Sequence, residues 1–349
     1  MTIIYIFISL FFLSFIIFVH ELFHLFAAKW LKIEATEFAV GMGKAIFSLQ
    51  KQKNKIVTKF FAGPNDEIFN DQGIVYHVRA IPLGGYVSFG KEKDGVLEDG
   101  LSKHAPWKRI IVAAAGPIGN ILFAWVLMFA LLATTSYKGT GLFVTQVEKN
   151  SLAQELGMKS SAVIKKVNHQ SVHTTEDLKK QLTSSSSICV TYDYKGNSTT
   201  KCGKLKDEKN PILGVGLKEH ISFLESIPKS GESIYRLTTL YTKAFVHTIY
   251  GLKVHELSGP IGIIDTMQQH TTNIEEFVQI LVLINIGLAA ANLLFPLSIT
   301  DGGRIVIDII AILVKKHALP TKHLDFICVL LMLCLFLTST FMDIKRLIG

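Results

Sequence analysis

The sequence predicts a polytopic α-helical membrane protein with about four transmembrane helices, a membrane-associated β-hairpin region and an inserted extracytoplasmic α+β domain. Hydrophobic residues make up 49% of the 349 residues and the mean hydropathy is +0.37, which is too apolar for an ordinary soluble protein. The apolar residues are also clustered, because four uncharged runs each approach the roughly 20 residues that span a bilayer. Two long polar segments with short apolar alternations separate the first three runs.

The transmembrane helices are expected where charge is absent. We predict helices over residues 1–28, 110–137 and 277–300, and a fourth helix with a tail over 326–349. They surround the uncharged runs Thr2–Val19, Ile110–Tyr137, Phe277–Thr300 and Phe326–Met342. We do not interpret the first run as a cleaved signal peptide, because it lacks a basic leading region and no convincing cleavage site follows it. The fourth run is short enough to be a buried helix, but Lys322, Lys345 and Arg346 flank it as interface anchors.

Basic residues orient the predicted helices. The segment 29–109 is basic beside both neighbouring helices, so the positive-inside rule places it in the cytoplasm. The flanking basic residues are Lys29, Lys32, Lys108 and Arg109. The chain from 138 to 276 then lies outside, and 301–325 lies inside. The formal charge of +8 does not indicate nucleic-acid binding, because the lysines are scattered and no basic block is interleaved with aromatic residues.

Two segments between the helices have regular patterns. In the 29–109 region, apolar residues alternate along Phe38-Val40-Met42 and along Tyr76-Val78-Ala80, which is typical of strands. In the 223–276 segment, apolar residues recur at helical spacing. This predicts an amphipathic interfacial helix, and an ordinary packing face fits the spacing equally well. The recurring residues are Ile234, Leu237, Tyr241, Ala244, Phe245 and Ile249.

The first apolar run leads into His20-Glu21-Leu22-Phe23-His24, where polar side chains are costly unless they have partners. An H-E-x-x-H pattern on a helix puts two imidazoles one turn apart on one face, where both can bind one zinc ion. Glu21 is then placed to hold and deprotonate the attacking water. The alternatives are a self-satisfied polar cluster between helices, or a proton relay in an ion transporter.

A catalytic zinc needs a third protein ligand and an open position. The first and third predicted helices run in the same direction, so Asp301 is expected on the same side and at a similar depth as the histidines. Pro296 and the Gly302-Gly303 pair break helical hydrogen bonding, which favours irregular backbone lining a cavity. Asp301 in isolation fits a helix cap equally well, but opposite the histidines we favour a ligand.

These features resemble the site-2 protease family of intramembrane zinc metalloproteases, in its regulator of sigma E protease branch. The resemblance covers nearly the whole chain, and the segments that carry it are FVHELFHLFAAKW, FAVGMGKAIFSLQ, YHVRAIPLGGYVSFGKE, WKRIIVAAAGPIGNILFAW and LSGPIGI. It implies that His20, His24 and Asp301 bind Zn²⁺ and that Glu21 is the general base.

The sequence departs from the family pattern N-x-x-P-x-P-x-L-D-G just before Asp301. Ser298 replaces the second proline, Thr300 replaces the leucine, and Leu293 stands where the family has asparagine. Asn292, one residue earlier, is our candidate for the substrate-binding role that the resemblance implies for that asparagine.

Two glycine motifs have structural and functional interpretations. An exposed strand edge in the 29–109 region would bind the substrate as an added strand, and Gly84 and Gly85 would allow close backbone approach. The alternative is a small structural hairpin with a Pro-Leu-Gly-Gly turn. Gly116 and Pro117 in the second helix are interpreted as packing scaffold rather than chemistry.

Residues 138–222 resemble a single PDZ domain, in which Leu142, Phe143 and Val144 would form the peptide-binding edge. Within this domain, VTYDYKGNSTTK reads as a hairpin with Lys195-Gly196-Asn197 at its turn. The hairpin brings Cys189 and Cys202 close to disulfide range, and we predict a bond if the domain is external. Unpaired thiols are the alternative. Cys328 and Cys334 are expected to be buried packing residues.

The resemblance implies an intramembrane zinc endopeptidase. It would cut the transmembrane segment of a single-pass protein after another protease has trimmed that protein, as in regulated cleavage of anti-sigma factors or remnant signal peptides. Its partners would be these substrates and the lipid bilayer, and no nucleic acid. It would be a multi-pass protein of the bacterial cytoplasmic membrane with the PDZ-like domain outside. The altered sequence before Asp301 suggests an alternative, a catalytically impaired zinc- or peptide-binding scaffold.

Overall fold

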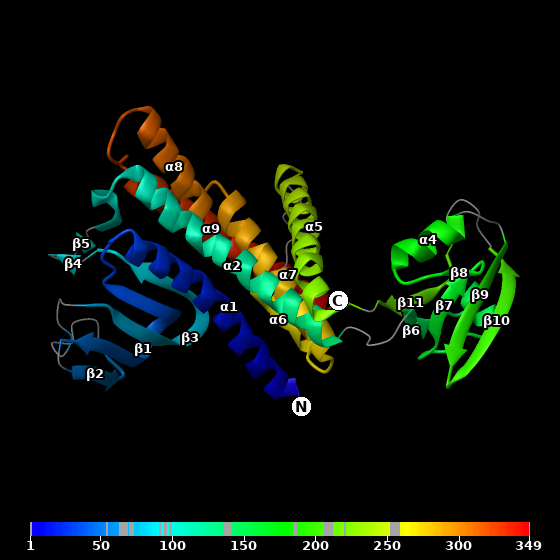
Figure 1. The fold of residues 1–349 in the computed structure, drawn as a ribbon. Helices are drawn as coiled ribbons and strands as arrows, with labels where there is room; N and C mark the ends of the chain where they lie inside the picture. Colours follow the sequence, from blue (N-terminus) through cyan, green and yellow to red (C-terminus); the bar gives the residue numbers. More distant parts are fainter. Residues whose placement is uncertain are drawn as a thin grey trace. The chain divides into compact units, whose positions relative to one another are not determined.

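A computed structural model describes most of the chain (Figure 1). The described residues are 2–53, 55–62, 69, 73–90, 92–93, 96–97, 100–135, 141–183, 187–205, 212–219, 221–251 and 259–348. The chain forms two compact units. One combines Met1–Met128 with Glu232–Gly349, and the other is Phe129–Gly231. Residues 257–258 of the LSGPIGI segment lie outside the described part.

Four described helices are long and apolar enough to cross a membrane, which agrees with the four predicted. They are α1 (Thr2–Trp30), α2 (Pro106–Thr135), α7 (Ile274–Leu294) and α9 (Lys322–Ile348). The predicted end of the third helix at residue 300 is wrong. Helix α7 ends at Leu294 and Phe295 is extended (ψ 119°), because a proline disfavours the helical conformation in the residue before it.

The segment predicted as one amphipathic region contains two helices, α5 (Phe223–Tyr250) and α6 (Pro260–His270). Ile234, Leu237 and Tyr241 of α5 pack with residues of α2 and α7 in one cluster. The helical spacing seen in the sequence is therefore a packing face. Helix α6 contacts α1, α7 and α9 (Figure 1).

The N-terminus of α6 is held by a side chain from α9. Asp343 is 1% exposed and accepts hydrogen bonds from the backbone N–H groups of Gly259 (3.2 Å) and Gly262 (2.8 Å). A Cβ atom on either glycine would come within 2.7 Å of the Asp343 carboxylate. The glycines of the LSGPIGI segment thus make room for a buried carboxylate, which is well placed at a helix N-terminus.

The region before α2 is a curled sheet rather than a simple β-hairpin. Its strands have the order β2-β1-β3 and are β1 (Glu37–Gln52), β2 (Lys55–Phe60) and β3 (Val75–Ser88). Residues 37–40 pair with 75–78 on one side and with 85–88 on the other, and 47–50 pair with 75–78 as well. In the described pairing, 85–88 forms one edge of this sheet and β2 forms the other.

The curl depends on glycines inside the long strands. Gly41 and Gly43 of β1 and Gly84 of β3 have φ angles of 87°, 82° and 87°, which allow each strand to fold back on its partner. The alternating sequence predicts the strands but not this double pairing, because alternation sets only which face a side chain occupies. Short elements β4 (Glu92–Lys93), β5 (Val96–Leu97) and η1 (Gly100–Lys103) precede α2.

The second unit is an α+β fold, as predicted. Its strand order is β10-β9-β7-β6-β11, with β8 paired to β7. The elements are β6 (Leu142–Val147), α3 (Leu152–Glu155), β7 (Val163–Val167), β8 (Gln170–Ser171), α4 (Thr175–Thr183), β9 (Ser187–Tyr194), β10 (Asn197–Lys204) and β11 (Val215–Lys218). Side chains from the strands and both helices form one buried cluster.

The predicted peptide-binding edge at Leu142, Phe143 and Val144 is wrong. These residues begin β6, which lies between β7 and β11. Leu142 and Val144 are completely buried in the core of the unit, and Leu217 of β11 pairs with Val144. The covering strand comes from a distant part of the chain, so the local pattern could not reveal it.

The predicted disulfide is confirmed, with a corrected turn. Cys189 and Cys202 lie directly opposite each other on β9 and β10 and are bonded. The turn contains only Lys195 and Gly196, at φ 51° and 83°, the left-handed pair that a two-residue hairpin requires. Of the other cysteines, Cys328 is buried as predicted, whereas Cys334 is exposed.

Candidate metal centre

Helix α1 supplies two imidazoles to one buried point. His20 and His24 are one turn apart and are 5% and 8% exposed. Their Nε2 atoms are 3.1 Å apart, so both rings direct the same nitrogen to a common position. The predicted pairing of these two side chains is present.

Helix α8 (Asp301–Leu313) supplies a carboxylate to the same point. The Asp301 oxygens lie 3.2 Å from Nε2 of His20 and 3.4 Å from Nε2 of His24. The residue that caps α8 is Thr300, whose hydroxyl accepts a hydrogen bond from the Gly303 backbone. The capping alternative for Asp301 is therefore wrong, and the departure from the family pattern at residue 300 provides the cap.

The glycines after Asp301 allow the chain to turn there. A Cβ atom on Gly302 would lie 1.8 Å from the carbonyl oxygen of Leu293, and one on Gly303 would lie 1.8 Å from that of Leu297. Any other residue would push the segment between α7 and α8 away from the start of α8. The two glycines thus bring Asp301 close to the end of α7.

The three side chains are close enough to hold one metal ion together, with one donor atom from each lying within 4.8 Å of the others. Among the described residues, His20, His24 and Asp301 form a group that could hold a metal ion. The closest contacts between their donor atoms are 3.1–3.4 Å. A tetrahedral ion with bonds of about 2.0–2.1 Å has ligand-to-ligand distances of about 3.3–3.4 Å. Two imidazoles and a carboxylate also leave the fourth position that a catalytic zinc needs.

Hydrogen bonds orient the two imidazoles from the opposite ring nitrogen. Nδ1 of His24 is 2.7 Å from the Val112 carbonyl oxygen, so it donates there and leaves Nε2 as the acceptor. Nδ1 of His20 is 3.1 Å from the amide of Asn120, which is completely buried and whose Oδ1 has no other partner among described residues. With the amide oxygen turned to the ring, the same tautomer results.

Gly116 of α2 makes room for the metal ligands. A Cβ atom there would lie 2.3 Å from Nε2 of His24 and 2.7 Å from Cε1 of His20. The sequence interpretation of Gly116 as helix scaffold therefore missed a direct role at the centre. The sequence analysis also did not identify Asn120 as a partner of His20. Its amide side chain within an uncharged transmembrane run could have indicated a functional position.

Glu21 lies between this centre and the curled sheet. It interacts electrostatically with both histidines and with Asp301. On its other side, a Cβ atom on Gly85 would lie 3.1 Å from Cγ of Glu21 and 2.9 Å from the Ala39 carbonyl oxygen. Gly85 therefore permits the close approach that the sequence suggested, and it brings the edge segment 85–88 against Glu21.

Tyr86, next to Gly85, is not suited to proton transfer. Burial and a hydrogen bond that its hydroxyl donates to Glu37 (2.6 Å) raise the pKa of Tyr86 to about 12. The phenol therefore stays neutral and structural at ordinary pH. Among the groups beside the centre, Glu21 is the candidate base.

Asn292 also reaches the centre. Its amide nitrogen is 3.3 Å from Nε2 of His20. A metal ion would take that His20 nitrogen, which would free the amide for another acceptor. The predicted role of Asn292 in binding substrate stays a prediction.

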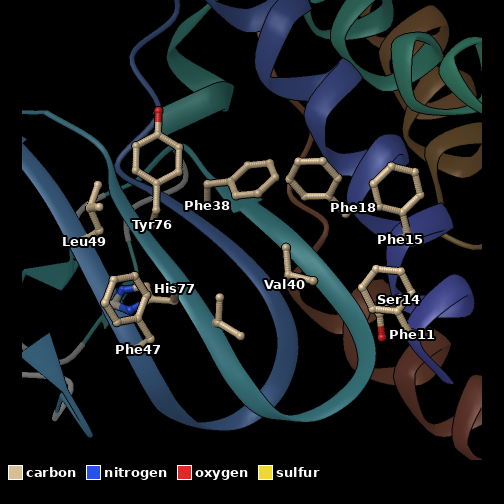
Figure 2. Close-up of a pocket in the computed structure, with 11 residues that line it drawn as sticks. Phe11, Ser14, Phe15, Phe18, Phe38, Val40, Phe47, Leu49, Tyr76 and His77 are labelled. Carbon is tan, nitrogen blue, oxygen red and sulfur yellow. The ribbon is translucent and has the colours of Figure 1, made fainter. Parts of the chain in front are cut away.

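An apolar pocket of about 660 Å³ lies between α1 and the curled sheet. Figure 2 shows Phe11, Phe15 and Phe18 of α1 on one side and Phe38 and Val40 of β1 on the other. The rings of Phe18 and Phe38 meet edge to face at 5.7 Å. Val40 pairs with Gly85, so the pocket adjoins the edge segment beside Glu21.

Comparisons with known proteins match the chain to one family and to several named relatives. The sequence profile described as "Peptidase family M50" matches residues 8–64 and 52–338. Cj1068 of Campylobacter jejuni is 26% identical, over 97% of this chain and 92% of its own. FN1322 of Fusobacterium nucleatum is 28% identical, over 93% and 95%. Zinc metalloprotease RasP of Shouchella clausii is 25% identical, over 96% and 97%. All three relatives carry zinc metalloprotease names.

Solved structures also match a part of the chain. One of them is the PDZ domain of the SdrC-like protein Lmo2051 from Listeria monocytogenes, which covers 24% of this chain and 93% of its own, with 15% identity and a TM-score of 0.21. The PDZ-like character of the second unit stays a prediction from the sequence.

Proposed function

Because the chain belongs to peptidase family M50, we propose that it is a zinc endopeptidase that hydrolyses a peptide bond within the transmembrane segment of single-pass membrane proteins. The observation that carries this proposal is the convergence of His20, His24 and Asp301 on one point, with Glu21 beside them. These side chains come from α1 and α8, which are distant in the sequence.

Each residue of the centre has a role in this reaction. Zinc held by the three ligands would supply a Lewis acid that polarises a peptide carbonyl and acidifies a water molecule. Glu21 accepts the proton of the attacking water and passes it to the leaving amine. Val112 and Asn120 hold the imidazole rings in the orientation and tautomer that metal binding requires.

The curled sheet could hold the substrate next to Glu21. A helical substrate has its backbone groups satisfied, so it must unwind before cleavage. The edge segment 85–88 would bind the unwound backbone as an added strand beside Glu21. The adjoining apolar pocket, lined by the phenylalanines of α1, suits apolar side chains of a transmembrane segment.

The function is tested with a tagged single-pass reporter whose outer domain has been reduced to a short stub. Co-expression with the parent chain should yield a fragment whose new end, mapped by mass spectrometry, lies inside the membrane segment. A zinc chelator should prevent the cut and added zinc should restore it. The same reporter with its full outer domain is the control and should stay intact.

Two outcomes would contradict this proposal. A cut that persists with the chelator would exclude a zinc protease. Stable co-purification of uncut reporters, without a fragment from any of them, would favour the scaffold alternative instead. No contact in the described residues favours that alternative, because Thr300 replaces the family leucine with a working helix cap.

We also propose that the protein is embedded in the bacterial cytoplasmic membrane, with residues 29–109 in the cytoplasm and the PDZ-like domain, residues 138–222, outside. Support comes from the four apolar helices and from the basic residues that flank the first two. The Cys189–Cys202 bond adds support, since disulfides persist outside the cytoplasm. The partners would be the lipid bilayer and substrates already cut by another protease.

This orientation predicts a labelling pattern in intact cells. In a variant that lacks Cys328 and Cys334, a membrane-impermeant thiol reagent should label the chain only after reduction, when Cys189 and Cys202 become free thiols. Labelling without reduction would show that the two cysteines are not bonded, but it would still place them outside the cell membrane. Labelling that requires permeabilised cells would invert the orientation.

A further inference from the structure

Helix α8 bears two acidic residues seven positions apart, Asp301 at the metal centre and Asp308 further along. Seven residues correspond to nearly two full helical turns and a rise of about 10.5 Å, so both lie on one face of α8. Helix α2 carries Arg109 and Gly116 with the same spacing of seven residues. Gly116 abuts His20 and His24.

Arg109 and Asp308 form a second contact between these helices. Their side chains are 2.5 Å apart, and both residues are 6% exposed. Since Gly116 lies at the metal ligands and Arg109 lies at Asp308, α2 and α8 run antiparallel with two matching points. One point is the metal centre and the other is this buried ion pair, about 10.5 Å away along both helices.

The Arg109 guanidinium also holds the chain on both sides of this contact. It donates to the carbonyl oxygens of Ser102 (3.1 Å) in η1 and His317 (3.0 Å) in the connection after α8. A planar guanidinium imposes a fixed direction on each of its hydrogen bonds. The group therefore fixes both the rotation and the axial position of α8 against α2.

Such a pair is unlike an ordinary stabilising contact. The free-energy cost of removing two charges from water largely cancels their attraction. Apolar residues of similar volume often stabilise a fold equally well. Helix α8 also has exposed apolar side chains, including Val306, Ile309 and Leu313. Apolar contacts tolerate sliding and rotation, whereas a one-residue slip would turn Asp301 by about 100° and move it by about 1.5 Å.

We propose that Arg109 and Asp308 are positioning residues for the third metal ligand. They set the register of α8 so that the Asp301 carboxylate stays within reach of both histidine Nε2 atoms. The inference rests on the proposed function in that it treats these three side chains as the zinc ligands. On this view, the main role of the Arg109–Asp308 pair is to maintain the geometry of the metal centre rather than to stabilise the fold.

The test separates these two roles with purified full-length protein in detergent. Zinc affinity is measured by competition with a chelator, and stability by the thermal unfolding midpoint. Arg109→Met and Asp308→Leu alone each break the buried ion pair and remove only one of its two charges, so both measurements should fall. The double variant removes both charges. It should recover most of the midpoint but keep a zinc affinity about 10–100-fold below the parent, as for other residues that orient metal ligands.

A double variant with the midpoint and the zinc affinity of the parent would overturn the inference. If the double variant does not fold, Arg109→Lys replaces it, because lysine keeps the charge but loses the planar set of donors. That variant should fold and bind zinc more weakly, and unchanged affinity would again overturn the inference. The matched control is Arg236→Met with Glu232→Leu, an exposed pair on α5, which should alter neither measurement.

Zinc affinity is measured without substrate, so the two proposals fail in different ways. A parent chain that binds zinc but cuts no reporter would contradict the proposed function. The zinc affinities of the variants would still test the positioning role of Arg109 and Asp308.

Discussion

Replacing Glu21 by glutamine should abolish cleavage while zinc remains bound at the stoichiometry of the parent. Glutamine has nearly the shape of glutamate but cannot accept the proton of the attacking water. General-base catalysis is typically worth about 10²–10⁴-fold in rate. The zinc ligands are unchanged in this variant, so the zinc content should stay at the parent level although the activity is lost.

The measurement combines two assays on the same purified preparation. The reporter fragment gives the cleavage rate, and elemental analysis gives zinc per chain. Glu34→Gln is the matched control, because Glu34 is exposed in the connection that follows α1 and should tolerate the change. Cleavage by Glu21→Gln at the parent rate would remove Glu21 as the base and with it the proposed mechanism.

The second large effect is expected from one methyl group at Gly116. The Cβ atom of Gly116→Ala would lie 2.3 Å from the metal-binding nitrogen of His24. Either the imidazoles rotate away or α2 withdraws from α1, and both movements separate the ligands. Overpacking of this kind typically costs about 1–3 kcal/mol. We expect zinc affinity at least about tenfold below the parent, with cleavage lost in proportion.

The control for this variant is Gly287→Ala on α7. A Cβ atom on Gly287 meets nothing within 4 Å, so the substitution tests the effect of alanine in a helix without a clash. Alanine favours helices over glycine by about 1 kcal/mol, and this control should be at least as stable as the parent. Full zinc content in Gly116→Ala would mean that α2 does not pack against the ligands as described.

The sequence by itself determined the features that depend on local spacing. The period of an α-helix places His20 and His24 on one face, and the length of the uncharged runs identifies four helices that could span a membrane. Asp301 was predicted from helix direction and family resemblance together, and the Cys189–Cys202 bond from a hairpin pattern. Except for Asp301, which is distant from the histidines, these inferences need only a rule that relates neighbours along the chain.

Only the tertiary structure decided the other contacts between distant residues. Gly116 and Asn120 lie about a hundred residues from the histidines that they contact, and Arg109 is even further from Asp308. Strand β11 covers β6 from a similarly distant position, which is why Leu142–Val144 is not an edge. Periodicity fixes the face on which a side chain lies, but not the element that faces it. That partner is set by the mutual packing of several helices and strands, in which each glycine or buried charge permits one close approach and excludes others.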